Sequence, residues 1–202
     1  IKLNAPALYE LYPGLQGRAY GSLNVQSQPR LKATANIAVD NFAFNELASI
    51  RSLRIQGELP TSEATPTLLI AKVDHLRSGN REIEDATINL GGTRKAHVLK
   101  VESNNRQSNF YVQLAGGFNQ NNDWLGQLQK GHFKSRRIDL VQNQSAPIIY
   151  STAQSELYIG QHCWQSLHSQ VCLDQPARMS QTKGSFSVIT KNLDLNDFAV
   201  FM

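Results

Sequence analysis

The chain has 202 residues and a mass of 22.5 kDa, which is long enough to bury a sizeable core without cross-links. Hydrophobic residues make up 41% and charged residues 18%, and the mean hydropathy is -0.36, which excludes a disordered tail and a membrane-embedded bundle. No apolar run approaches the roughly 18 residues of a membrane-spanning helix. Because the sequence begins at Ile1, we expect a piece of a longer protein whose targeting information lies elsewhere.

The net charge of +4 and the pI near 9.1 favour anionic partners only weakly. Basic residues are scattered along the chain, and their tight group is Lys134, Arg136 and Arg137. No RNA-binding motif or interleaved aromatic residues accompany this group, so we expect no nucleic-acid partner. The group is either a solvated surface or a contact for lipid phosphate.

A short helix is predicted near the N-terminus. Asn4 can cap it, Pro6 is tolerated in its first turn, and Pro13 and Gly14 end it after about two turns. Such a helix would either cap one end of a sheet or pack on its surface.

Alternation of apolar and polar residues predicts β-strands through most of the remaining chain. The predicted strands are 19–26, 31–39, 53–59, 67–73, 83–90, 97–101, 110–118, 124–133, 136–141, 147–151, 155–159 and 184–190. Turns or loops are predicted at 27–30, 60–66, 78–80, 91–92, 103–107 and 119–123. No connecting segment is helical enough for a parallel crossover, so the predicted fold is all-β, a long antiparallel meander over residues 1–202.

The two cysteines, Cys163 and Cys172, lie close together in the sequence. A disulfide between them would close a ten-residue loop and stabilise the fold by roughly 2.5–3 kcal/mol. A zinc site would need His162 and His168 as well, but the neighbours His162 and Cys163 cannot easily point at one ion, and no Cys-x-x-Cys spacing is present. We therefore favour the disulfide over metal, and two free buried thiols remain the third possibility.

No catalytic constellation is recognisable. The sequence has no Gly-x-Ser-x-Gly element, phosphate-binding loop or His-Glu-x-x-His motif, and the histidines are dispersed. His75, His97 and His132 occur singly within predicted strands, where a histidine at the edge of the core is more common than a catalytic base. We expect no enzyme activity, no catalytic residue, no metal and no cofactor.

Several segments resemble the central region of the TamB family, which belongs to the AsmA-like superfamily of Gram-negative bacteria. The clearest is 157–164 (LYIGQHCW), followed by Cys172 and Leu173. Residues 11–18 (LYPGLQGR), which run into 21–25 (GSLNV), and the closing 193–195 (LDL) support the resemblance.

The resemblance implies a periplasmic protein whose full-length form is anchored in the inner membrane. Its sheet would curl into a hydrophobic trough, the β-taco, and the family pairs with the TamA outer-membrane barrel. The family is linked to the assembly of outer-membrane proteins and to phospholipid movement between the membranes, and has no known catalytic residues. An oxidising periplasm agrees with a disulfide.

A curled sheet with one apolar face needs a second layer, and the sequence offers no amphipathic helices to supply it. Phospholipid acyl chains would cover the face, since each buried methylene contributes about 0.8 kcal/mol. The residues predicted to line the groove are Leu23, Val25, Leu31, Ile37, Val39, Leu53, Ile55, Ile88, Leu90, Phe110, Val112, Leu114, Phe118, Leu128, Leu140, Leu157 and Ile159. The same residues would suit the core of an ordinary sandwich or barrel.

Two other functions compete with lipid carriage. Exposed edge strands could capture β-strands of outer-membrane proteins or of the TamA barrel without carrying lipid. A closed β-sandwich that binds carbohydrate is the third alternative.

Overall fold

The computed structural model describes residues 1–27, 31–45, 47–79, 81–106 and 108–193. These ranges contain fifteen strands and one short 3₁₀ helix (η1, Leu8–Glu10), and the strand pairings with a described register are all antiparallel. The strands are β1 (Lys2–Ala5), β2 (Leu15–Gln26), β3 (Lys32–Phe44), β4 (Ala48–Leu59), β5 (Thr67–Ser78), β6 (Arg81–Gly92), β7 (His97–Asn104), β8 (Ser108–Phe118), β9 (Trp124–Ser135), β10 (Asp139–Gln142), β11 (Ala146–Ser151), β12 (Glu156–Ile159), β13 (His162–Gln165), β14 (Gln170–Met179) and β15 (Gly184–Lys191). The predicted all-β antiparallel fold is confirmed.

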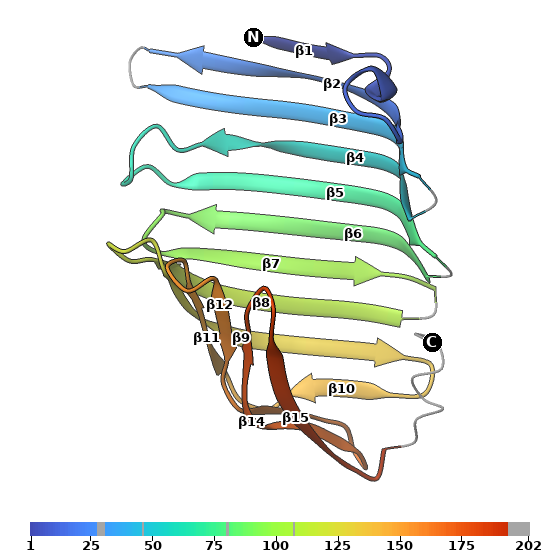
Figure 1. Cartoon of the computed structure of the whole chain (residues 1–202), viewed down its shortest axis with the longest axis vertical. Helices are drawn as coiled ribbons and strands as arrows, with labels where there is room; N and C mark the ends of the chain where they lie inside the picture. Colours follow the sequence, from blue (N-terminus) through green and yellow to red (C-terminus); the bar gives the residue numbers. More distant parts are fainter. Residues whose placement is uncertain (28–30, 46, 80, 107, 194–202) are drawn as a thin grey trace. The chain divides into compact units, whose positions relative to one another are not determined.

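The chain divides into two compact units, which we describe separately. Unit 1 comprises residues 1–93 and 101–106, and unit 2 comprises 94–100 and 107–202. In unit 1, β1 to β6 lie side by side in chain order (Figure 1). The strands predicted at 19–26 and 31–39 form a hairpin, because Gln26 of β2 pairs with Lys32 of β3; residues 28–30 of the predicted turn lie outside the described residues.

The predicted N-terminal helix is wrong except for a single 3₁₀ turn. Asn4 caps nothing, because it lies in β1 and pairs with Tyr20 of β2. The residue that precedes η1 is Ala7, which has no side-chain cap. Pairing with β2 satisfies the backbone groups of residues 2–5, so this segment extends rather than forming helical turns.

The predicted turn at 91–92 is also wrong. Gly91 and Gly92 are the last residues of β6 and pair with Leu68 and Thr67 of β5, so the chain reverses after them, within residues 93–96. Strand pairing therefore continues through both glycines, and Gly92 has a positive φ of 122°, which glycine adopts without strain.

Unit 2 continues the meander through two bent strands. On β9, His132 pairs with Val141 of β10 and Leu128 pairs with Ala146 of β11, so β10 and β11 are two halves of one strand that runs antiparallel to β9. In the same way β12 and β13 both run antiparallel to β14. Figure 1 shows β11 and β12 turned away from the direction of β10.

Irregularities in neighbouring strands accompany the bend in unit 2. The register of β8 and β9 shifts near Leu114, and the amide of Gln142 donates to the Leu128 carbonyl oxygen at 3.0 Å where the two halves of the bent strand meet. A further register shift between β14 and β15 follows Leu173. Bulges of this kind increase the local bend and twist of a strand.

Candidate functional site: the apolar faces of the sheet

One face of unit 1 is a continuous set of aliphatic side chains. Residues opposite each other in antiparallel strands share a face, so the register can be followed from strand to strand. Ile37 of β3 lies opposite Ile55 of β4, which lies opposite Ala71 of β5, and Ala71 lies opposite Ile88 of β6. The same face includes Leu23, Val25, Ala35, Val39, Leu53, Leu69, Val73 and Leu90, and we call this set the unit 1 apolar face.

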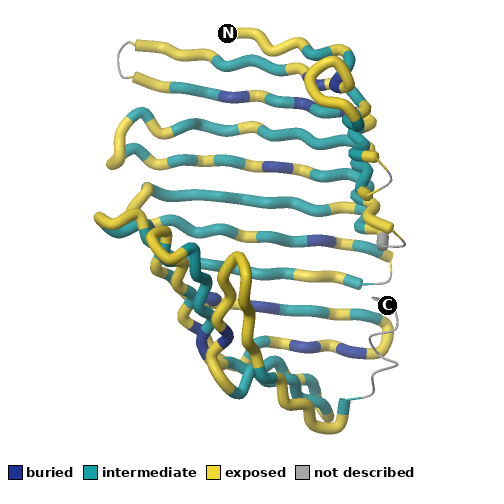
Figure 2. Tube along the Cα trace, in the orientation of Figure 1, coloured by how far each residue is buried: buried dark blue, intermediate teal, exposed yellow. Residues whose placement is uncertain are grey.

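No second layer of protein covers this face within the described part of unit 1. Its leucines, isoleucines and Val39 are half-buried, Val25 is 59% exposed, and the buried members are Ala35 and Ala71. Across the described residues no large side chain is fully buried. The buried stretches in Figure 2 are correspondingly short, unlike the close-packed interior of an ordinary sandwich.

The opposite face of unit 1 is largely polar. Arg54 lies opposite Lys72, and Asn36 lies opposite Gln56, although Ala38 and Ile70 lie among these side chains. Adjacent residues of a strand therefore present different surfaces: Ile55 belongs to the apolar face and Gln56 to the polar one.

A charged cluster on the polar face surrounds Asp40, which is 8% exposed. Its carboxylate pairs with the Arg54 guanidinium at 2.6 Å and with Arg18 at 3.5 Å, and it accepts a hydrogen bond from the Tyr20 hydroxyl at 3.0 Å. The hydrogen bond from Arg54 is the main cause that lowers the pKa of Asp40 below its ordinary value of 3.8. The cluster therefore links β2, β3 and β4.

We expect this cluster to make unit 1 sensitive to acid. Ionised Asp40 stabilises the fold above its ordinary pKa of 3.8, and this contribution is lost as the pH falls through the lowered pKa of the folded state. Thermal unfolding measured between about pH 6 and about pH 2 should show a weaker acid dependence for Asp40→Asn than for the native chain. Tyr20→Phe retains the Arg54–Asp40 pair and should keep most of the acid dependence. An unfolding temperature that falls equally with pH in Asp40→Asn and in the native chain would contradict the role given to Asp40.

Unit 2 has an apolar face of its own. Phe110, Val112 and Leu114 of β8 lie opposite Phe133, Gly131 and Leu128 of β9. The other members are Phe118, Trp124, Leu140, Ile148, Leu157, Ile159, Trp164, Val171, Leu173, Ala177 and Met179, and we call this set the unit 2 apolar face. Leu128 and Leu140 are buried, whereas Phe110 is 39% exposed.

The predicted groove residues therefore fall into two sets. Sixteen of the seventeen lie on these faces, eight in each unit. Leu31 lies just before β3 and is exposed. Whether the sixteen bind lipid stays a prediction at this point.

Both tryptophans lie on the unit 2 apolar face and cover glycines, which sequence analysis missed. A Cβ added at Gly116 would lie 2.7 Å from Cζ2 of Trp124, and one at Gly131 would overlap the Trp164 ring. The Trp124 indole also donates from Nε1 to Nε2 of His97 at 2.8 Å. The signal that could have found these contacts is the glycines themselves, because Gly116 of β8 leaves room for the Trp124 ring and Gly131 of β9 leaves room for the Trp164 ring.

We expect Gly131→Ala to displace the Trp164 ring and destabilise the fold by about 1–3 kcal/mol, the usual cost of overpacking. Urea unfolding and the tryptophan fluorescence spectrum report the two effects. Gly91→Ala is the matched control, because a Cβ there would meet only the Leu68 Cδ2 atom at 3.6 Å. A Gly131→Ala variant as stable as Gly91→Ala, with an unshifted spectrum, would contradict the packing described.

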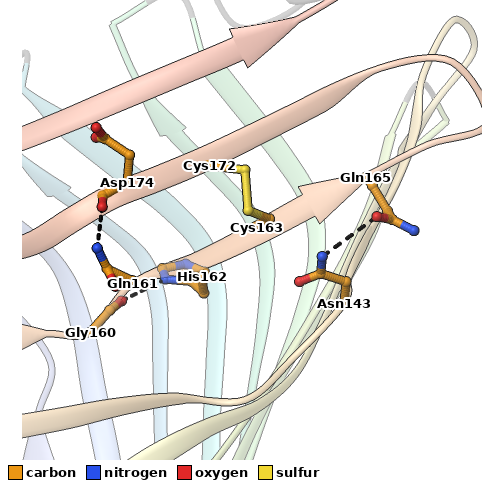
Figure 3. Close-up of a disulfide and its surroundings, with 8 residues drawn as sticks. All are labelled: Asn143, Gly160, Gln161, His162, Cys163, Gln165, Cys172 and Asp174. Atoms are coloured by element: carbon orange, nitrogen blue, oxygen red, sulfur yellow. Dashed lines mark hydrogen bonds between the residues drawn. A yellow bond between two sulfur atoms is a disulfide. The ribbon is translucent and has the colours of Figure 1, made fainter.

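The predicted disulfide between Cys163 and Cys172 is present. The two residues are directly opposite on β13 and β14, with Cα atoms 4.0 Å apart (Figure 3). His162 lies on the other face of β13, next to Leu173, so it does not join the sulfur atoms in a metal site. The described residues include no group of three or more side chains that could hold a metal ion.

The predicted basic group is partly neutralised. Lys134 lies 3.3 Å from the Asp139 carboxylate, which also bonds to His132 at 2.7 Å. The hydrogen bond from His132, followed by that from Lys134, lowers the pKa of Asp139. Arg136 and Arg137 are exposed in the turn between β9 and β10. Their exposure is compatible with both predicted roles of the group, a solvated surface and a contact for lipid phosphate.

The described residues include no helix that is both long and apolar enough to cross a membrane.

Comparison with known proteins gives the family. The family described as TamB, N-terminal domain, matches residues 1–202. The chain belongs to the TamB family. The matched domain is described as N-terminal, whereas the sequence segments had suggested a central region of TamB-family proteins.

One TamB relative is the translocation and assembly module subunit TamB of Haemophilus influenzae. It is 25% identical over 201 residues, which cover 96% of this chain and 15% of the relative. The chain therefore spans about a seventh of the length of that TamB protein. No solved structure matches.

Proposed function

We propose that the chain carries phospholipid acyl chains along its apolar faces, as part of a translocation and assembly module between the inner and outer membranes. The observation that carries the proposal is the unit 1 apolar face, where no described residue of unit 1 forms a second layer over the register-matched aliphatic residues of β2 to β6. The relative's name, translocation and assembly module subunit TamB, supports the wider role.

The energetic argument is that acyl chains supply the missing layer. Each methylene removed from water contributes about 0.8 kcal/mol, so a chain of a dozen gains on the order of 10 kcal/mol. A lipid that slides along a continuous apolar face keeps its tail covered, and the barrier for each step is then much smaller than that of full desorption. The headgroup stays in water.

Membership of the TamB family supports a proposal for the surroundings of the full-length protein. We propose a periplasmic location, with an inner-membrane anchor outside this chain and the TamA barrel as the partner in the outer membrane. The disulfide between Cys163 and Cys172 supports an oxidising compartment. No catalytic role enters this proposal.

Strand capture is the second candidate function. β1 pairs with residues 19–22 of β2, and the Leu23 N–H donates to the Ile1 carbonyl oxygen at 2.8 Å. Beyond Leu23, no described strand pairs with this edge of β2. An unpaired edge offers main-chain hydrogen bonds to an incoming β-strand. Outer-membrane protein clients or the TamA barrel would supply that strand.

Native mass spectrometry of the purified chain separates the two functions. Lipid carriage predicts phospholipid adducts that survive purification and disappear after detergent exchange. Strand capture predicts a lipid-free chain that forms a 1:1 adduct with an added amphipathic β-strand peptide. A lipid-free chain purified from a phospholipid-containing extract would contradict the primary proposal.

A further inference from the structure

A groove on the polar face of unit 1 lies outside the proposed lipid path. It extends over β1, β2, β3 and β4, which run side by side (Figure 1), and it has a volume of about 480 Å³. Ligand pockets commonly have volumes of this size. Eight of its eleven lining residues form two rows of register partners across the four strands.

The first row is hollow at its centre. It consists of Asn4 of β1, Tyr20 of β2, Ala38 of β3 and Arg54 of β4. Ala38 has a small side chain between the large ones of Tyr20 and Arg54, so the row dips at β3. The Tyr20 hydroxyl and the Arg54 guanidinium both bond to Asp40, and the guanidinium lies 5.9 Å from the centre of the Tyr20 ring. These contacts hold both walls of the groove in place in the absence of a ligand.

The second row carries hydrogen-bonding groups that the protein does not use. It consists of Lys2, Ser22, Asn36 and Gln56, from the same four strands. In the described part of the chain none of these four side chains makes a hydrogen bond or an ion pair. They offer an ammonium, a hydroxyl and two primary amides, and the last two kinds of group both donate and accept. Because neighbouring strands are about 4.8 Å apart, the row extends over about 14 Å.

Positive charge exceeds negative charge around the groove. Lys2 and Arg54 line it, and Lys72 of β5 lies opposite Arg54. The carboxylate of Asp40 is shared between Arg54 at 2.6 Å and Arg18 at 3.5 Å. Lys2 and Lys72 form no ion pair with any described residue. One carboxylate therefore faces four cations.

The neighbouring carboxylates of the polar face do not offset this excess. Glu58 pairs with Lys32 at 2.5 Å, and Asp74 pairs with Arg51 at 3.6 Å. The net positive potential of the groove attracts an anionic ligand.

These features match an oligosaccharide that carries carboxylates. An acyl chain in the groove would remove the polar groups of the second row from water without replacing their hydrogen bonds, which is costly. Sugar hydroxyls both donate and accept, as the amides and the hydroxyl of this row do. Tyr20 is 42% exposed, and the C–H groups of a sugar ring pack favourably against an aromatic face. A bare phosphate ion would use the cations and leave the amides without partners.

We propose that this groove binds an acidic oligosaccharide, with Tyr20 and Arg54 as its walls and the second row as its hydrogen-bonding groups. The site lies on the reverse of the unit 1 apolar face, since Gln56 follows Ile55 on β4 and the two side chains point to opposite faces. Saccharide and lipid thus occupy different faces of the sheet, and the inference does not depend on the proposed lipid carriage.

Isothermal titration calorimetry of the whole 202-residue chain tests the site with two probes that differ only in charge. Tetragalacturonate carries a carboxylate on every ring, and its full methyl ester has the same rings without the charges. We expect tetragalacturonate to bind about tenfold more tightly than the ester, because several cations surround the groove. Lys2→Gln should weaken the binding of tetragalacturonate by about threefold, the usual size of one exposed charge contact, and leave the ester unchanged.

Asn36→Ala tests the hydrogen-bonding row. It should weaken the binding of both probes by about fivefold, the usual loss for a hydrogen bond between neutral groups. Asn24→Ala is the matched control, because Asn24 is an exposed asparagine on the same face, opposite Thr34, and does not line the groove. This control should leave both affinities unchanged, and circular dichroism establishes that both variants fold.

Each contrary result overturns a stated part of the proposal. Equal affinities for tetragalacturonate and its ester would refute an acidic ligand, and equal effects of Asn36→Ala and Asn24→Ala would refute the site. Displacement of tetragalacturonate by an equal concentration of glycerol phosphate would indicate a site for phosphate headgroups and refute the saccharide. A chain that binds neither probe at millimolar concentration would refute the whole proposal and leave the proposed lipid carriage standing.

Discussion

Replacing Ile55 by aspartate is expected to remove most of the phospholipid bound to unit 1 while the sheet still forms. Ile55 lies between Ile37 and Ala71 in the middle of the unit 1 apolar face. A carboxylate there would have to lose water against acyl chains, at a cost that exceeds the gain from several methylenes. We expect a drop of at least tenfold in bound lipid, measured by native mass spectrometry.

The control variant is Gln56→Asp, which places the same charge one residue away on the polar face. Circular dichroism and the urea midpoint establish that both variants fold. Leu114→Asp on β8 is the corresponding change in unit 2, since Leu114 lies opposite Leu128. If Ile55→Asp and Gln56→Asp retain equal amounts of lipid, the apolar face is not the binding surface.

Loss of the disulfide has the second large expected effect. Because Cys163 and Cys172 are nine residues apart, their bond closes a ten-residue loop, and Cys163→Ser combined with Cys172→Ser should destabilise the chain by about 2.5–3 kcal/mol. Urea unfolding of the native and variant chains measures the difference, with the tryptophan signal of Trp164 as a reporter beside the cysteine.

A reductant provides the internal comparison for this prediction. Dithiothreitol should lower the urea midpoint of the native chain to that of the double serine variant and leave the variant unchanged. If mass spectrometry shows two free thiols after reduction while the urea midpoint of the native chain is unchanged, the bond contributes nothing to stability.

The strands and their apolar faces could be predicted because both follow from alternation. Pairing in register then brings Ile37, Ile55 and Ile88 to one face, because successive side chains of a strand point to opposite faces of the sheet. The disulfide was predictable from the cysteine spacing and from the difficulty of a metal site with adjacent His162 and Cys163.

Elements that depend on a partner strand escaped sequence analysis. β13 and β14 hold cysteines, glutamines and a proline, so their alternation is weak, and their partners in β10, β12 and β15 define them. The segment at 2–5 has a helix-like cap signal, but pairing with β2 prevails over it. The bend between β10 and β11 arises from a local shift of register, which residue patterns do not encode.

The central claim is that lipid tails lie on the unit 1 apolar face and not on its reverse. Its most direct test places a photoreactive amino acid at Ile55 or at Gln56 in the full-length protein, in living cells, and analyses the adducts by mass spectrometry. The account predicts phospholipid adducts at position 55 and none at position 56. Protein adducts alone at position 55, or lipid adducts equally at both positions, would contradict it.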